Sequence, residues 1–191
     1  MTGATGFIGR HLVEELLRNR EGDVHVLVRE DSRDKLDALI ARWPDAERVK
    51  PVVGDLQQRN LGHDDAWVEE HRGRIEHFFH LAAIYDMTAA DELNERLNVG
   101  GTGHAVELAN ALEAGHLHHM SSVAVTGEFK GLFREDMFDE GQKLPSPYHR
   151  TKYESERVVR ESPMTSDGRY TRHGTLACSR TTRSDSYFVR W

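Results

Sequence analysis

The chain has 191 residues, enough for one domain with a sizeable core, and its net charge of -7 at pH 7 is interspersed along the sequence. Such an acidic chain is not a general nucleic-acid binder, and no apolar run approaches the ~20 residues that a membrane-spanning helix needs. A single cysteine, Cys178, excludes a disulfide framework and fits a reducing compartment. We therefore expect a cytoplasmic protein with no nucleic-acid partner and no membrane span.

Strand and helix patterns alternate along most of the chain. Apolar residues at helical spacing predict helices over 8–17, 36–43, 91–112 and 148–161. Short runs of β-branched and apolar residues predict strands over 24–28, 49–55, 75–83 and 116–125. Pro51 places the second of these strands near a sheet edge. The alternation predicts an α/β fold with a Rossmann-type doubly wound parallel sheet.

The pattern stops near Pro163. Residues 164–191 are rich in Thr, Ser and Arg and show neither alternation nor helical periodicity before a weak apolar run near the end. Two interpretations stay open, a flexible or disordered tail and a segment translated in a shifted frame. We therefore expect a folded domain over 1–163 and an irregular tail over 164–191.

The chain opens with MTGATGFIGRH, in which Gly3, Gly6 and Gly9 lead into the first predicted helix. Glycines at this spacing let the backbone turn tightly and approach a pyrophosphate, whose charge is favoured at a helix N-terminus. The spacing alone is a weak signal, because small residues also occur in ordinary strand–helix turns. It favours a dinucleotide site, with a purely structural turn as the alternative.

Residues just after two predicted strands bear on the choice of dinucleotide. Arg29 follows the strand over 24–28, where an acidic residue would bind ribose hydroxyls and an arginine favours a 2′-phosphate. Glu30 comes directly after it and weakens the distinction. Asp55 ends the next strand, where its side chain would reach an adenine amine or simply cap a turn. We expect NADP as the cofactor, with NAD as the alternative.

A tyrosine, a lysine and a serine are candidates for acid–base chemistry. Tyr148 and Lys152 share one helix face at i and i+4, and a tyrosine with a reference pKa near ~10 needs a nearby cation to act as an acid at neutral pH. Ser121 and Ser122 end the preceding strand, where α/β sheets bind ligands. A serine hydroxyl there would polarise a carbonyl or satisfy loose backbone groups. Each signal is weak in isolation.

The histidines of HLHHM do not complete a metal site. On a strand, His116 and His118 share one face and His119 lies on the other, with no carboxylate or cysteine nearby to complete a ligand set. We expect no bound metal.

The order of the motifs is more specific than any one of them. TGATGFIG, GDL, HLAA, NVGGT, SSVAVTG and YHRTK follow one another over residues 2–162 in a pattern that resembles the extended short-chain dehydrogenase/reductase superfamily. HLAAIYDMTA and DEGQKLPSPYHRTKYESE resemble most its branch of fatty acyl-CoA and carrier-thioester reductases. Two alternatives remain: a nucleotide-sugar epimerase or dehydratase with bound NAD, and a non-catalytic dinucleotide-binding module.

The resemblance implies a role for each matching residue. Tyr148 would be the general acid, Lys152 would lower its pKa and bind ribose, Ser122 would orient the carbonyl, and Asn98 would kink its helix and support the lysine through water. The expected cofactor contacts are Gly3, Gly6, Phe7, Ile8, Gly9, Arg29, Asp55, Leu56, Leu81, Ala82, Ala83, Tyr148 and Lys152. The implied reaction is hydride transfer to a small carbonyl or acyl-thioester substrate.

The chain departs from the superfamily pattern at both ends. Members have an apolar central strand before TGATG, and here Met1 stands where its last residue would be. After the helix of Lys152 they have another strand with an arginine–proline step and then a substrate-binding region, and here the irregular tail takes that place. We expect a largely missing first strand, an absent substrate-binding region and thus a piece of a longer enzyme. By the same resemblance, a homodimer would pair through the helices at 91–112 and 148–161.

Overall fold

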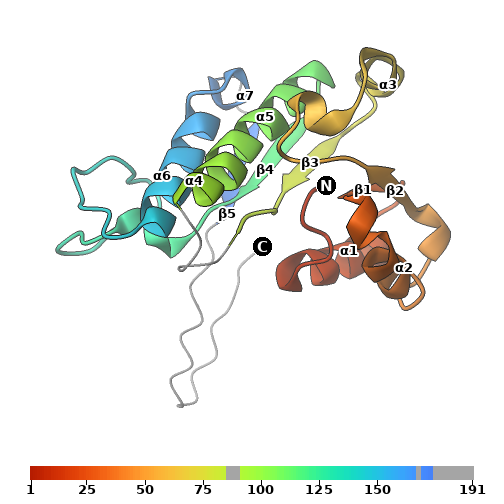
Figure 1. Ribbon diagram of the computed structural model, residues 1–191, viewed down its shortest axis with the longest axis horizontal. Coiled ribbons are helices and arrows are strands. Elements are labelled where there is room, and N and C mark those ends of the chain that lie inside the picture. The colour runs from red at the N-terminus through yellow and green to blue at the C-terminus, as the bar shows by residue number, and fades with distance from the viewer. Residues whose placement is uncertain (85–90, 167–168, 174–191) are drawn as a thin grey trace, which may run out of the picture.

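The computed structural model describes residues 1–84, 91–166 and 169–173. Helices and strands alternate along the chain, as Figure 1 shows. Their order is α1 (Phe7–Asn19), β1 (Val24–Val28), α2 (Arg33–Ile40), β2 (Val49–Val53), α3 (Asp65–His71), β3 (His77–His80), α4 (Asp91–Asn94), α5 (Gly101–Ala111), β4 (His116–Met120), α6 (Pro147–Arg160), α7 (Pro163–Ser166) and β5 (Tyr170–His173).

All strand pairings are parallel, and two residues at the start of the chain join them into one layer. β1 pairs with β2, and β3, β4 and β5 form a second group in that order. The Leu27 amide donates to the Met1 carbonyl at 2.9 Å, and the Thr2 amide donates to the Phe79 carbonyl at 2.8 Å. The spatial order is therefore β2, β1, Met1–Thr2, β3, β4, β5, so two residues occupy the position of the central strand.

Two apolar clusters cover opposite faces of this layer, which makes the fold doubly wound. One packs α1 and α2 onto β1 and β2, and its buried members are Ala4, Val13, Leu17, Val26, Val28, Leu36, Trp43 and Val49. The other packs α5 and α6 onto β3 and β4 and includes Phe78, Val106, Leu117, Val159 and Met164. Leu27 contacts the second cluster while Val26 and Val28 belong to the first, because alternate side chains of a strand point to opposite faces.

The helix expected over 91–112 is continuous but changes its winding. Residues 95–100 form a π-helical segment between α4 and α5. A Cβ built on Gly101 would lie 3.3 Å from Leu56 Cβ, so a glycine here permits close packing against the loop after β2. The local widening sets Asn98 at the level of α6, with which this segment packs.

The observed strands are shorter than expected at their carboxyl ends. β3 ends at His80 and β4 at Met120, because the chain then leaves the layer to form the site described below. β2 ends at Val53 and lies at the edge of the layer, which confirms the position inferred from Pro51.

The structure departs from the expected irregular tail at its beginning. β5 pairs with β4 from Leu117↔Tyr170 to Met120↔His173, and Met164 is fully buried in the second apolar cluster. The side chains of 170–173 are all half-buried, so the strand has no apolar alternation by which a pattern could find it. The strand expected after the helix of Lys152 is therefore present, with Arg172 followed by His173 rather than proline. Residues 174–191, including Cys178, lie outside the described part.

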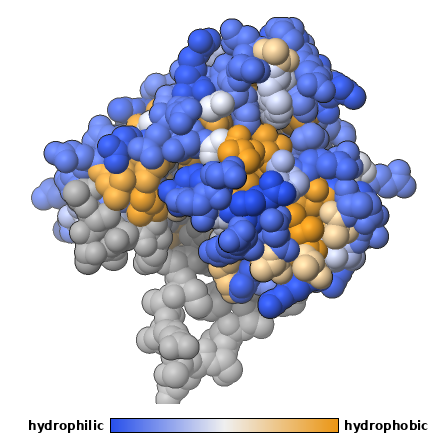
Figure 2. Space-filling model, turned by 45° about the vertical axis from the view of Figure 1, so that its right-hand side comes forward, coloured by the Kyte–Doolittle hydropathy of each residue, from blue (hydrophilic) through white to orange (hydrophobic). Residues whose placement is uncertain are grey.

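Polar side chains cover most of the face drawn in Figure 2, with separate apolar patches between them. Within the described ranges, no helix combines the length and apolar character needed to cross a bilayer.

Candidate active site

The glycine turn, residues 3–9, packs so closely against other backbone segments that side chains would not fit at Gly3 and Gly9. Gly3 has φ +76°, and a Cβ built on it would lie 2.7 Å from the Ala82 amide nitrogen. A Cβ on Gly9 would lie 2.1 Å from the Gly3 carbonyl oxygen. Gly6 occupies the N-cap of α1 and provides no side-chain hydrogen bond. The start of α1 at Gly6 thus has no side-chain cap and borders a cleft, the kind of helix terminus that suits a phosphate.

A cleft of about 390 Å³ opens beside this turn. Its walls are formed mainly by four segments, which follow Thr2, β1, β2 and β3. The expected contact residues among its lining are Gly3, Gly6, Arg29, Asp55, Leu56, Leu81, Ala82 and Ala83. Phe7 and Ile8 instead lie on the surface, 71% and 39% exposed, and Gly9 is buried behind the turn.

Arg29 lies at the rim of the cleft, between it and an adjoining hollow of about 460 Å³ that also contains Glu30, Asp31 and Asp55. Its Nε is 3.5 Å from Asp31 Oδ1, and both side chains are largely exposed. A solvent-exposed pair of this kind is weak, so the guanidinium remains available to an anion.

The tyrosine and the serine meet across two elements. Ser146 caps α6 by accepting a hydrogen bond from the His149 amide, and Pro147 takes the first helical position, so the helix begins one residue before Tyr148. Ser122 is the second residue after β4. The Tyr148 hydroxyl donates to Ser122 Oγ at 3.4 Å, and Ser122 Oγ also accepts from the Ala124 amide at 3.2 Å.

Lys152 lies one turn further along α6 and is 4% exposed. Its Nζ donates to the Met120 carbonyl at 2.9 Å. Burial lowers the pKa of Lys152 from 10.5 to about 8, while the charge of Glu156 acts in the opposite direction. The side chain is thus a buried cation whose pKa lies not far above neutral pH. It lies next to the end of β4, which leads to Ser122.

Asn98 connects the cleft to α6, the helix of Tyr148 and Lys152. Its Oδ1 accepts from the Ile84 amide at 2.8 Å, and its Nδ2 donates to the Ile84 carbonyl at 3.2 Å and to Thr151 Oγ1 at 3.3 Å. Ile84 lines the cleft, and Thr151 precedes Lys152 on α6. Asn98 lies in the π-helical segment, and the hydrogen bonds of its side chain are with Ile84 and Thr151 rather than with Lys152.

Sequence reasoning missed a buried chain of hydrogen bonds between the glycine turn and Asn98. Thr102 Oγ1 donates to the Asn98 carbonyl at 2.6 Å, so its oxygen accepts from His80 Nε2 at 3.0 Å. His80 Nδ1 is then an acceptor for the Thr2 hydroxyl at 2.9 Å, and Thr2 Oγ1 accepts from the Ala82 amide at 3.2 Å. This directional chain requires a neutral imidazole. Burial agrees with it, lowering the pKa of His80 to about 3.

The histidines of β4 lie on the two faces of the strand as expected. His116 and His118 lie on one face and His119 on the buried face with His80, the two rings being 5.7 Å apart. His118 contacts His77 at 3.0 Å and His173 at 3.1 Å between ring nitrogens. In the described part of the chain, no three His, Cys, Asp or Glu side chains are grouped to hold a metal ion.

Comparison with known proteins agrees with this geometry. The family model described as male sterility protein, an NAD-binding family, matches residues 1–182. The chain belongs to this family. It is 29% identical over 153 residues to a putative fatty acyl-CoA reductase of Drosophila melanogaster, a match that covers 72% of this chain and 28% of that protein.

Solved structures show the same fold. The terminal R domain from the myxalamid PKS-NRPS biosynthetic pathway superposes with a TM-score of 0.75 at 29% identity, over 92% of this chain and 46% of that one. MoeE5 in complex with UDP-glucuronic acid and NAD superposes with a TM-score of 0.65 at 28% identity, over 91% and 52%. The chain thus spans about half of these structures and less than a third of the Drosophila protein. The family model, the Drosophila relative and the R domain agree with the fatty acyl-CoA reductase branch of the extended short-chain dehydrogenase/reductase superfamily, and MoeE5 agrees with the fold.

Proposed function

We propose that the protein carrying this chain is an NADPH-dependent reductase that acts on a small carbonyl or acyl-thioester substrate. The observation that carries the proposal is the contact between the Tyr148 hydroxyl and Ser122 Oγ, with the buried Lys152 one helical turn away. The kinship with a putative fatty acyl-CoA reductase supports the thioester class.

The cleft fits a dinucleotide. The lack of a Cβ at Gly3 lets the Leu81–Ala82 backbone pack against the glycine turn, and the uncapped start of α1 suits a pyrophosphate. Leu56 and Asp55 would flank the adenine, and Leu81, Ala82 and Ala83 would form the wall behind the nicotinamide ribose. The 2′-phosphate would lie against Arg29.

A bound nicotinamide would supply the hydride, and the protein side chains would handle orientation and the proton. Ser122 Oγ would hold the carbonyl oxygen by hydrogen bonding, and the Tyr148 hydroxyl would deliver a proton to that oxygen. With a pKa of about 8, Lys152 is largely protonated at neutral pH, so it stabilises the phenolate that forms when the proton leaves. Asn98 would keep the cleft wall at Ile84 in register with α6.

Replacing one hydroxyl tests the proposal. In Tyr148→Phe, turnover of acyl-CoA and aldehyde substrates should fall by ~10²–10⁴-fold, since the general acid is lost while the ring remains. The dissociation constant for NADPH, measured by fluorescence, should stay within about twofold because the cleft lining is untouched. Tyr153→Phe on the same helix, where the ring stacks on Phe138 at 4.6 Å, is the matched control. An unchanged rate in Tyr148→Phe would show that this hydroxyl does not act in catalysis.

A second candidate is an epimerase or dehydratase acting on a nucleotide sugar with bound NAD, favoured by the likeness to MoeE5, which was solved with such ligands. The two candidates differ in the cofactor. A tightly retained NAD in the purified protein, together with conversion of UDP-sugars, would favour the second. Exchangeable NADPH consumed in proportion to product would favour the first. Cofactor binding without either reaction would indicate a non-catalytic module.

A further inference from the structure

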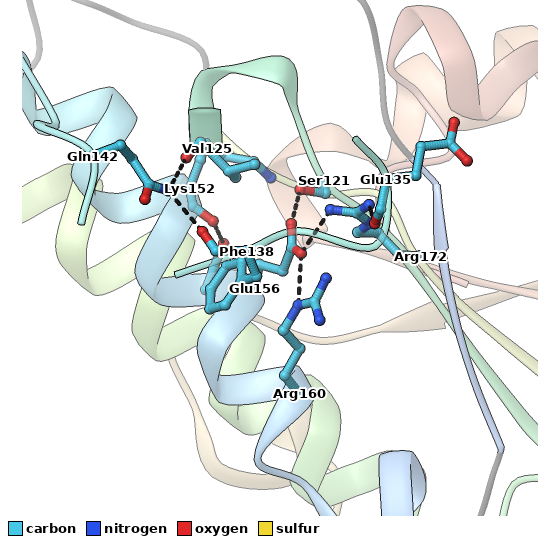
Figure 3. Close-up of polar contacts among 10 residues, drawn as sticks. Ser121, Val125, Glu135, Phe138, Gln142, Lys152, Glu156, Arg160 and Arg172 are labelled. Atoms are coloured by element: carbon cyan, nitrogen blue, oxygen red, sulfur yellow. Dashed lines mark hydrogen bonds and ion pairs between the residues drawn. The ribbon is translucent and has the colours of Figure 1, made fainter. Parts of the chain in front are cut away.

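Glu156 is a buried carboxylate that the proposed mechanism does not use. It follows Tyr148 and Lys152 on the same face of α6, at i+8 and i+4, and its exposure is 0%. One carboxylate oxygen accepts from Arg160 Nε at 2.8 Å and from Arg172 Nη1 at 3.0 Å, and the other accepts a short hydrogen bond from Ser121 Oγ. Figure 3 shows these three partners converging on it from different directions.

The partners of Glu156 come from separate parts of the fold. Ser121 is the residue before Ser122 at the end of β4, and Arg172 lies on β5 and also donates to the Glu135 carbonyl. The guanidinium of Arg160 lies 4.5 Å from the centre of the Phe138 ring. The carboxylate therefore joins the catalytic helix to the strand end of Ser122, to β5 and to the segment between Ser122 and Tyr148.

Glu156 has a second effect, which is electrostatic: its charge raises the pKa of Lys152. His80 of β3 and His119 of β4 face Lys152 from the sheet, and burial lowers the pKa of both imidazoles, that of His80 to about 3. Both rings are therefore neutral at neutral pH and contribute no charge. Within the described ranges, Glu156 is the charge that raises the pKa of Lys152 against burial. Arg160 and Arg172 partly neutralise this carboxylate.

We propose that Glu156 is a positioning residue for the reaction: its carboxylate fixes Ser121, and so the strand end that carries Ser122, and supplies the negative charge that keeps Lys152 a cation. The first part acts on geometry and the second on protonation. Its catalytic consequence rests on the proposed function, but its effect on Lys152 does not.

Glu156→Gln separates the two parts: the glutamine oxygen can still accept from the arginines and its NH2 can donate to the Ser121 hydroxyl, while the charge is lost. We expect the alkaline arm of the kcat profile to move to lower pH by about one unit, with the KM for the carbonyl substrate unchanged. Glu154→Gln, two residues earlier and paired with Arg150, removes the same charge from the same helix and should leave the arm in place. The proposal would be overturned if the alkaline arm of the kcat profile in Glu156→Gln stayed at its wild-type pH, or if it shifted equally in both variants.

Two further variants cover the case in which Glu156→Gln does not fold. Ser121→Ala should lower kcat and leave the alkaline arm in place, because it removes the anchored hydroxyl and no charge. Arg172→Gln should move the arm in the opposite direction, to higher pH, because Glu156 is then less neutralised. An arm that stays in place or moves down in Arg172→Gln would contradict the electrostatic part, and an unchanged kcat in Ser121→Ala would contradict the geometric part.

A measurement on Lys152 itself distinguishes this proposal from the proposed function. In protein labelled with ¹³C at lysine Cε, the resonance missing from Lys152→Met identifies Lys152, and its titration midpoint is followed by NMR. The midpoint should fall in Glu156→Gln and stay in Glu154→Gln. If the wild type reduces no carbonyl substrate, the proposed function fails while this titration still decides the role of Glu156.

Discussion

The two halves of the site are built from different parts of the chain. The glycine turn is made of backbone atoms from a few consecutive residues, where Gly3 and Gly9 allow contacts that a Cβ would prevent. The half around Ser122, Tyr148 and Lys152 is made of side chains from the segment just after β4, from α6 and from β5, held by hydrogen bonds between residues distant in sequence. The first half requires that Gly3 and Gly9 have no Cβ atom, and the second requires particular polar side chains.

The largest expected effect comes from filling the space at Gly9. In Gly9→Ala the new Cβ would meet the Gly3 carbonyl oxygen at 2.1 Å, and neither backbone segment can yield without opening the turn. We expect a loss of about 5 kcal/mol in the free energy of unfolding, or failure to fold.

Gly103→Ala on α5 is the control, since nothing lies within 4 Å of its added Cβ. Alanine in an open helix interior should stabilise the protein by ~0.5–1 kcal/mol. Denaturant unfolding measures both variants. Equal, small effects would mean that the turn tolerates a side chain and that the contrast between the two halves is weaker than the geometry indicates.

The hydrogen-bond chain through His80 joins the two halves and makes stability depend on pH. The pKa of His80 is about 3 in the folded protein against an ordinary value of 6.5, so between these values the unfolded chain binds a proton that the folded one does not. Stability therefore falls as the pH drops from 6.5 towards 3, with His80 contributing about 4 kcal/mol of that loss.

His80→Gln should flatten this decline, because an amide can bond Thr2 and Thr102 without titrating. His116→Gln, at an exposed position on β4, should leave the decline as it is. Urea unfolding at a series of pH values gives the comparison. A decline as steep in His80→Gln as in the wild type would place the acid sensitivity elsewhere.

Sequence reasoning reached the backbone-built half more completely than the other. Glycine spacing carries its own geometric reason, so the position of the turn could be predicted from it. The resemblance supplied most of the other residues that line the cleft. Phe7 and Ile8 begin α1 but lie outside the cleft lining, because a pattern does not show which side of a helix start faces the cleft; their contact with a cofactor stays a prediction. Helical spacing and strand-end position made Tyr148, Lys152 and Ser122 candidates, and the resemblance gave them roles and added Asn98. These roles stay predictions, although the structure brings the first three together.

What sequence reasoning missed lies in contacts between distant segments. β5 has no alternation, and its place depends on pairing with β4. In the sequence, His80 is distinguished from its neighbours only by its place in a predicted strand. Its role depends on Thr2 and Thr102, which bond the two nitrogens of its ring. For Glu156 a signal existed: the i+4 spacing that joined Tyr148 to Lys152 extends to it. A buried carboxylate needs partners that sequence spacing cannot supply, and here they are Ser121, Arg160 and Arg172.

The smallest expected effect sharpens the comparison at the cofactor end, where a side chain rather than backbone is proposed to choose between dinucleotides. Arg29 is exposed at the rim of the cleft and only weakly engaged by Asp31. Arg29→Ala should raise the dissociation constant for NADPH by about tenfold, the value of one exposed charge-assisted contact, and leave that for NADH nearly unchanged. Arg33→Ala on α2, where the guanidinium pairs with Asp37 at 2.9 Å, should change neither. If Arg29→Ala weakens both dinucleotides equally, Arg29 contacts a group they share. If it weakens neither, the cleft selects its ligand by backbone alone, and NAD becomes the better assignment for this protein.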